Sequence, residues 1–273
     1  MENITCFLIS LKSDQNKRDK NLPNVKKLFP NTKVFDAFDA RNLSDTELKK
    51  YVHPATYNQI KQKREVDMLH MGSKGGVGCF ISHKNLWKKC IELNEPIIIC
   101  EDDIQLDKSS SINKVKKSFN SIPNDAVFAA LIGLPINFLA PSTKGTKVIS
   151  KNWKTVGHDF MGTQMYYVTP YAASVLLYYS EPIVNHVDMY IGQVALQDEN
   201  KWLRVRNNLN PQSYLTTIEN DFNSSVGHTL KLKKILPEHN NFWFIFISIV
   251  FLLIIIIIIQ GFKIRNLKKK YKF

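Results

Sequence analysis

The sequence predicts an α/β domain with a mostly parallel central sheet, followed by one membrane-spanning helix. Short apolar runs alternate with helical segments between residues 4 and 205, the order expected of a sheet covered by helices. One of these runs, at 96–100, ends in three consecutive carboxylates. A longer apolar stretch at 242–259 would extend about 27 Å as a helix, enough to cross a bilayer core. We expect a globular domain at 1–235, a membrane helix at 242–260 and a basic tail at 261–273.

The first elements are two strands separated by a helix. Residues 4–10 form an apolar run too short for a signal peptide, and residues 32–37 alternate as a second strand does. The polar turn between them leads into a helix that we expect to end near Pro30. A phosphate bound at this turn would lie near Arg18, although a solvated loop explains the same residues equally well.

A capping box marks the next helix. Ser44 has the residue type of an N-cap, and Glu47 follows three positions later. We expect this helix to stop before Pro54. The segment 49–74 is polar and basic with little periodicity, and it is interpreted as a surface excursion.

A glycine-dense segment at 72–78 opens a long amphipathic helix, expected at 77–93. Its glycines would let backbone N–H groups approach an anion, but no Gly-Lys-Ser/Thr sequence closes the segment as in a Walker motif. His83 lies on the apolar stripe of this helix. Such a histidine is usually a satisfied core residue; the alternative is that His83 projects towards a site at the end of the next strand. Cys79 and His83 have the spacing of a metal site, but two ligands are weak evidence for one.

The next strand ends in Glu101, Asp102 and Asp103. Its isoleucines suit a sheet that is covered on both faces. Adjacent acids repel one another unless a cation or several donors lie among them. Ligands of open α/β sheets bind beyond the carboxyl ends of the strands, so these acids are well placed to hold a divalent metal. A charged turn in which an aspartate caps a helix remains the simpler alternative.

The rest of the domain repeats the alternation of strands and helices. Pro170 stands where a helix tolerates proline, in the first turn. We expect helices at 111–119, 171–179 and 188–196, and strands at 126–131, 164–168 and 201–205.

Charge and cysteine content narrow the function. The formal charge is +13, of which about +7 remains on the first 241 residues once the basic tail is set aside. This moderate excess suits anionic substrates and gives little support for nucleic acid binding. The 4 cysteines form no C-x-x-C pair and are expected to be reduced.

Four motifs in register resemble glycosyltransferase family 25, which includes bacterial lipooligosaccharide galactosyltransferases and procollagen galactosyltransferases. Residues 78–87 are similar to the family pattern GC-x-x-SH-x-x-x-W, and residues 99–103 to its LEDD strand end. Residues 162–168 are similar to its GT-x-aY-x-I/V pattern, and residues 187–188 to its final aspartate motif. One departure is Gly76, where the family usually has an acid.

The resemblance implies a GT-A-like, Rossmann-type sandwich and a nucleotide-sugar-dependent transferase. A UDP-sugar would be the donor, galactose the expected sugar, and a glycan or protein hydroxyl the acceptor. Mn²⁺ or Mg²⁺ would be held by Asp103, supported by Asp102, with Glu101 on the ribose or the metal. Members that form β-linkages act with inversion, for which Asp188 is the candidate base; an N-cap explains Asp188 as well. His83, Arg18 and Thr163 are expected to contact the substrate.

Two other functions use the same residues. A metal-dependent phosphoryl or nucleotidyl transferase would need basic nucleotide-gripping loops, which the glycine segment lacks. A catalytically degenerate member would bind a glycan or a partner protein at the membrane. Gly76 slightly favours this alternative, whereas the intact Glu101-Asp102-Asp103 argues against it. The predicted C-terminal helix makes the chain a single-pass membrane protein, and its sequence leaves open which side carries the domain.

Overall fold

A computed structural model describes residues 3–62, 71–104, 106, 109–132, 148–150, 153–155, 160, 162–197 and 203–206. Within these ranges no helix has the length and apolarity needed to cross a membrane. The predicted helix at 242–260 and the basic tail at 261–273 lie outside the described residues.

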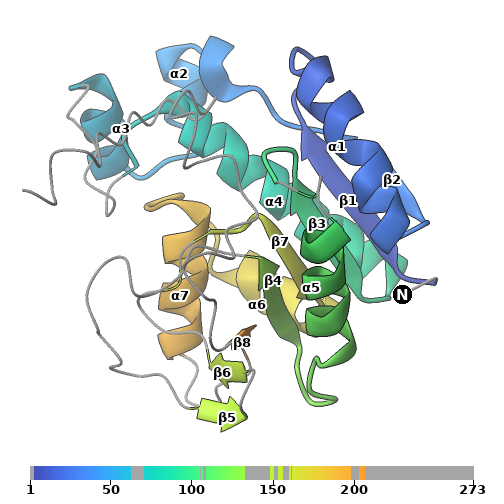
Figure 1. The fold of residues 1–273 in the computed structure, drawn as a ribbon. Helices are drawn as coiled ribbons and strands as arrows, with labels where there is room; N and C mark the ends of the chain where they lie inside the picture. Colours follow the sequence, from blue (N-terminus) through green and yellow to red (C-terminus); the bar gives the residue numbers. More distant parts are fainter. Residues whose placement is uncertain are drawn as a thin grey trace, which may run out of the picture. The chain divides into compact units, whose positions relative to one another are not determined.

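One sheet organises the described chain (Figure 1). Its 8 strands lie in the order β2-β1-β3-β7-β4-β8-β6-β5. The strands are β1 Thr5–Ser10, β2 Thr32–Asp36, β3 Ile97–Glu101, β4 Phe128–Ile132, β5 Val148–Ser150, β6 Trp153–Thr155, β7 Met165–Val168 and β8 Leu203–Arg206. The strands expected from sequence are present, and β5 and β6 are additions.

The sheet is mixed rather than mostly parallel throughout. Strand β1 pairs in parallel with β2 and β3, and β4 pairs in parallel with β8. Strand β7 lies between β3 and β4 and runs antiparallel to both. The expected parallel arrangement therefore holds within β2-β1-β3 and for β4 with β8. It does not hold at β7, nor at β6 and β5, which pair antiparallel with β8 and with each other.

The helices differ from the sequence expectations at two places. Helix α3 fills part of the segment interpreted as an irregular excursion, beginning with proline at its first position after the His53 cap. Helix α4 starts at Lys74, so Gly75, Gly76 and Gly78 lie inside it rather than in an anion-binding loop. The helices are α1 Gln15–Leu28, α2 Asp45–Leu48, α3 Pro54–Lys61, α4 Lys74–Leu93, α5 Ser109–Asn120, α6 Pro170–Tyr178 and α7 Val187–Gln197, with a 3-10 turn η1 at Ala40–Asn42.

Helices cover both faces of the sheet. Helices α1 and α5 contribute to one buried cluster, and α4, α6 and α7 contribute to the other (Figure 1). Strand β3 supplies Ile97 and Ile99 to the α4 side and Ile98 and Cys100 to the α1 side. Because successive side chains of a strand point to opposite faces, a strand covered on both sides is apolar at every position.

Helix α4 packs closely against the loop after β2 and ends in a left-handed residue. A Cβ atom at Gly78 would lie 2.5 Å from the carbonyl oxygen of Phe38, so the loop after β2 approaches the helix backbone closely. The helix ends at Asn94, whose φ of 51° is the left-handed conformation that closes many helices. The chain then turns directly into β3.

Candidate active site at the end of strand β3

The three acids after β3 are divided between the two faces of the sheet. Glu101 takes the α4 side, where its Oε1 lies 3.1 Å from His83 Nε2. Asp102 takes the α1 side, where its Oδ2 accepts a 2.6 Å hydrogen bond from Ser10 at the end of β1. Asn21 of α1 also donates to the Asp102 carbonyl oxygen at 2.7 Å. The alternation of the strand thus separates two carboxylates that are adjacent in sequence.

Asp103 experiences the charges of both neighbouring acids. Burial, followed by the negative charges of Glu101 and Asp102, raises the pKa of the Asp103 carboxyl to about 8. Burial also raises the pKa of Asp102, and the Ser10 hydrogen bond and the charge of Lys17 offset part of that rise. A site that destabilises carboxylates in this way is one that a cation would stabilise.

Glu101 is held in the ionised state. Burial by itself raises the pKa of this carboxyl, but hydrogen bonds from His83 and Thr163 and the interaction with His83 outweigh it, leaving the pKa below its ordinary value. The Thr163 hydroxyl lies 2.6 Å from Glu101 Oε1. In the described part of the chain, both side-chain hydrogen bonds to Glu101 therefore end on the same oxygen.

His83 is completely buried, and both of its ring nitrogens are engaged. Its Nδ1 lies 2.8 Å from the Tyr166 hydroxyl, which also accepts a 3.0 Å hydrogen bond from Trp87 Nε1. As arranged here, His83 has no nitrogen left for a substrate phosphate. Its predicted role in substrate binding remains a prediction, while the geometry connects it to Glu101.

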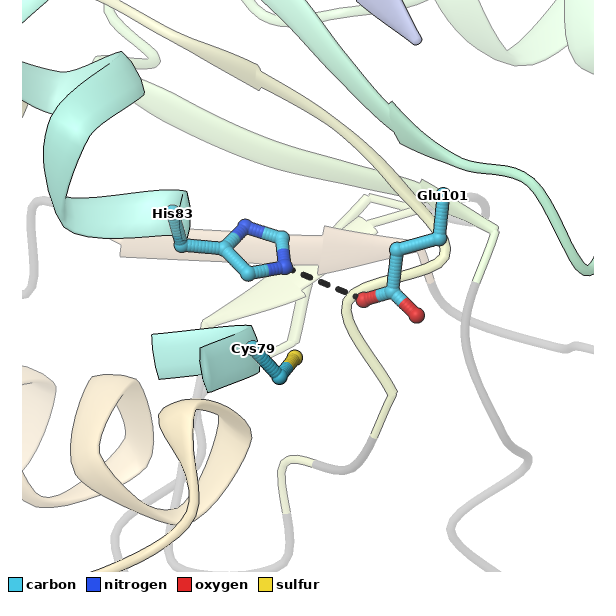
Figure 2. Close-up of side chains that lie close together, drawn as sticks. All are labelled: Cys79, His83 and Glu101. Carbon is cyan, nitrogen blue, oxygen red and sulfur yellow. Dashed lines mark hydrogen bonds and ion pairs between the residues drawn. The ribbon is translucent and has the colours of Figure 1, made fainter. Parts of the chain in front are cut away.

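Cys79, His83 and Glu101 form a compact group (Figure 2). Their nearest ligand atoms all lie within 4.8 Å of one another, and thiolate with imidazole would suit a soft ion such as Zn²⁺. Burial, and then the charges of Glu101, Asp188 and Asp103, raise the pKa of the Cys79 thiol well above its ordinary value. A metal here would need the thiol to lose its proton and would break the hydrogen bond between His83 and Glu101.

The same charges indicate that Asp188 belongs to this site. Asp188 lies in the first turn of α7, and its Oδ1 accepts from the Met189 N–H at 2.7 Å. Its Oδ2 accepts from the Gly162 N–H at 3.1 Å. Gly162 has a φ of 87°, which glycine adopts readily, and Thr163 follows it directly. One short segment thus contacts both Asp188 and Glu101.

Comparison with known proteins identifies the family of the chain. The model of glycosyltransferase family 25, described as an LPS biosynthesis protein, matches residues 3–191. The chain belongs to glycosyltransferase family 25. Among curated proteins, it is 31% identical over 106 residues to a glycosyltransferase 25 family member of Aedes aegypti. It is 26% identical over 102 residues to procollagen galactosyltransferase 2 of Mus musculus. Each match covers 37% of this chain and 16% of the relative, so the similarity spans about one sixth of those proteins.

The family 25 motifs meet in one place. His83 and Trp87 come from the motif on α4, Thr163 and Tyr166 from the motif at β7, and Glu101 from the end of β3. Hydrogen bonds join all five side chains, as described above. Each of these motifs therefore contributes a side chain that is hydrogen-bonded to a residue of another motif.

The departure at Gly76 leaves space that other side chains occupy. A Cβ atom there would lie 2.5 Å from Met71 Sδ and 3.1 Å from His186 Cε1. His186 precedes Asp188 by two positions, so this neighbourhood borders the site. The chain therefore lacks the family's usual acid at this position and has a thioether and an imidazole beside it.

Arg18 is not among the residues that the structure brings together. Its side chain lies 3.8 Å from Asp19 on the same helix. Among the described residues, the positive charge that lowers the pKa of the Asp102 and Asp103 carboxyls is that of Lys17. A predicted phosphate contact of Arg18 remains a prediction.

The sequence interpretation missed Lys17, Ser10, Asn21 and Tyr166. A signal for the helix residues was present, because Lys17, Asn21 and Val25 recur at intervals of four and so share one face of α1. Asn21 and Val25 are buried, which places Lys17 above the ends of the strands. Tyr166 stands at the tyrosine of the GT-x-aY-x-I/V pattern but was given no role, since a tyrosine in an apolar strand is ordinarily part of the core.

Proposed function

We propose that this chain is a glycosyltransferase that moves a hexose, with galactose as the expected sugar, from a UDP-sugar to a hydroxyl of a glycan or protein. Membership of family 25 supports the class of reaction. The procollagen galactosyltransferases among the relatives favour galactose, although they match only a small part of their length. The observation that carries the proposal is that one short segment joins two acids: Thr163 donates to Glu101 at the end of β3, and the neighbouring Gly162 N–H donates to Asp188 of α7. We further propose a GT-A-type arrangement for the fold and a membrane anchor at 242–260.

The carboxylates at the end of β3 offer the hard oxygen atoms that Mn²⁺ and Mg²⁺ prefer. Asp103 supplies a hard oxygen, and so does the Oε2 of Glu101, to which no described side chain donates. The raised pKa of Asp103 indicates an unmet demand for positive charge. We propose that Asp103 holds Mn²⁺ or Mg²⁺, that Glu101 contacts the ion or the ribose, and that Asp102 is anchored by Ser10 and supports them. Bound there, the ion would offset the charge that develops on the leaving nucleoside diphosphate.

Asp188 is the proposed base. In an inverting transfer, the acceptor oxygen attacks the anomeric carbon while the bond from that carbon to the diphosphate breaks. The acceptor proton passes to the Asp188 carboxylate, and the nucleoside diphosphate leaves with the electron pair. Main-chain N–H groups of Gly162 and Met189 orient one oxygen each, and each oxygen retains a further lone pair for the acceptor hydroxyl.

The test is a donor panel with the full chain. Release of nucleoside diphosphate from UDP-sugars and GDP-sugars is measured with and without Mn²⁺, in the presence of simple glycan acceptors. We expect turnover of one UDP-sugar that depends on the metal and falls at least 10²-fold in Asp103→Asn. In Asp188→Asn we expect donor binding to persist while kcat falls about 10²–10⁴-fold. The control is Glu92→Gln, which neutralises a carboxylate that is 62% exposed on α4.

The alternative function, binding without catalysis, predicts the opposite result in this assay. A folded chain that turns over no donor but retains glycan binding would be a degenerate member, as the absence of an acid at Gly76 suggests. Thermal melting of each variant separates loss of activity from loss of folding.

A further inference from the structure

A continuous path of hydrogen bonds leads from helix α4 to the end of β3. Trp87 Nε1 donates to the Tyr166 hydroxyl at 3.0 Å, and that hydroxyl lies 2.8 Å from His83 Nδ1. His83 Nε2 lies 3.1 Å from Glu101 Oε1. Trp87, Tyr166 and His83 are each 0% exposed, whereas the Glu101 side chain is 21% exposed. The path thus begins in the core and ends at a partly exposed carboxylate of the site.

The direction of each hydrogen bond follows from donor and acceptor chemistry. The indole N–H of Trp87 can only donate, so the Tyr166 oxygen accepts it. His83 Nε2 faces an ionised carboxylate and must carry hydrogen, because two lone pairs would otherwise repel each other. If Nδ1 also carried hydrogen, the buried Tyr166 hydroxyl would have no acceptor among the described residues. The arrangement that satisfies every group has Tyr166 donating to Nδ1 and Nε2–H donating to Glu101.

We propose that Tyr166 and His83 are positioning residues that fix the hydrogen of His83 on Nε2 and thereby orient the Glu101 carboxylate. Thr163, in the segment that leads into β7, donates to the same oxygen. Glu101 Oε1 is therefore held by two donors. The second oxygen, Oε2, is then directed away from both donors and remains for the donor substrate or its cation. The role given to Glu101 rests on the proposed function, but the hydrogen-bond arrangement does not.

A purely structural explanation is less complete. A buried hydrogen bond contributes a net of about 0.5–1.5 kcal/mol, and replacing both of its partners by apolar residues of the same shape is often nearly neutral for stability. Phe128 already stacks on Tyr166, with ring centroids 5.1 Å apart, so an aromatic ring without a hydroxyl would pack there. The hydroxyl and the imidazole are explained by what lies at the exposed end of the path, the Glu101 carboxylate.

The first test reads the histidine directly. The full chain is labelled with ¹⁵N-histidine, and two-bond ¹H–¹⁵N correlation spectra assign the tautomer, with His83→Gln identifying the His83 signals among those of the 7 histidines. We expect hydrogen on Nε2 and a bare Nδ1. In Tyr166→Phe, Nδ1 loses its donor, and we expect the population of the tautomer with hydrogen on Nδ1 to rise. Hydrogen on Nδ1 in the wild-type chain would overturn the proposal.

The second test is kinetic and has a matched control. Tyr166→Phe removes only the hydroxyl at the start of the path, while Tyr190→Phe removes another buried hydroxyl, which donates to the Leu176 carbonyl. We expect Tyr166→Phe to lower kcat/KM for the donor about 10–100-fold, the range found for residues that orient ligands, and to leave the acceptor KM unchanged. Tyr190→Phe should stay within about twofold of wild type.

Conservative replacement separates positioning from packing. His83→Gln keeps an N–H that can reach Glu101 and an oxygen that can accept from Tyr166, whereas His83→Leu keeps neither. We expect Gln to retain more activity than Leu when both variants are folded. Two results would show that the path of hydrogen bonds serves only packing. One is an equal loss of activity in both His83 variants, and the other is a loss in Tyr166→Phe that only follows its lower melting temperature. If no donor is turned over at all, the proposed function fails while the tautomer spectrum still decides this inference.

Discussion

At the scale of single residues, the site depends on which face of the sheet each acid takes. Glu101 is ionised by donors on the α4 side, and Asp102 is anchored on the α1 side. Asp103 lies within reach of both charges and has a pKa of about 8. Three adjacent letters in the sequence therefore describe three different electrostatic environments.

The raised pKa of Asp103 makes a prediction about stability. In an unfolded chain an aspartate titrates near 3.9, so the folded, metal-free protein binds this proton more tightly. The stabilisation from the protonated form is complete below about pH 4 and is lost as the pH rises to about 8. We expect the melting temperature of Asp103→Asn to fall less over this range than that of the wild-type chain. The difference should be on the order of several degrees, at about 2–4 °C per kcal/mol for a chain of this size.

Mn²⁺ provides the complementary measurement. It should raise the melting temperature of the wild-type chain more at pH 8 than at pH 5, because binding needs the ionised carboxylate. Asp103→Asn should gain little at either pH. Parallel melting curves for the two proteins, with and without the ion, would contradict the assignment of Asp103 to the cation.

At the scale of elements, helix α4 supplies Cys79, His83 and Trp87 to the site. Its entry glycines lie in the first turns of the helix, where the Gly76 N–H donates to the Ser73 cap and Gly78 packs against the loop after β2. Its apolar stripe was evident from the sequence, since Phe80, His83 and Trp87 recur at three- and four-residue intervals. Helix α3 was not expected, because only Thr56 and Ile60 of its residues are buried and so give little periodicity.

Two glycines of α4 give a matched prediction. A Cβ atom at Gly78 would lie 2.5 Å from the Phe38 carbonyl oxygen and 3.1 Å from the Ala40 nitrogen, both of them backbone atoms. Alanine gains about 1 kcal/mol of helix propensity over glycine, but displacing the backbone costs about 1–3 kcal/mol. We expect Gly78→Ala to lower the free energy of unfolding in urea, or to leave the helix displaced from the loop after β2.

Gly76→Ala is the control for this experiment. Its nearest obstacles are Sδ of Met71 and the His186 ring, which are side-chain atoms rather than backbone and can shift without moving the chain. We expect a change near zero, clearly smaller than that of Gly78→Ala. Equal effects at the two positions would show that the close approach at Phe38 does not constrain the helix.

At the scale of the whole molecule, the proposed helix at 242–260 would tether the chain to a membrane. Residues 242–259 are apolar apart from Ser248, and a cluster of lysines follows them. We expect the full chain to remain in the membrane pellet after carbonate extraction and a chain ending at residue 241 to be released. A variant whose basic residues in 261–273 are replaced by serine should stay in the pellet, because apolar insertion, not charge, holds it. Release of the full chain by carbonate would contradict the helix.

The sequence by itself determined the strand that ends in three acids, the helix before it and the capping box of α2, which the structure confirms. These features depend on neighbouring residues and on the periodicity of apolar positions, both of which can be recognised in the sequence. Only the tertiary structure decided that β7 enters antiparallel between β3 and β4. That insertion brings Tyr166 under His83 and Thr163 beside Glu101, across more than 60 residues of sequence. Such pairings arise from sheet order, which is set by contacts between distant segments and leaves no periodic signal in any one of them.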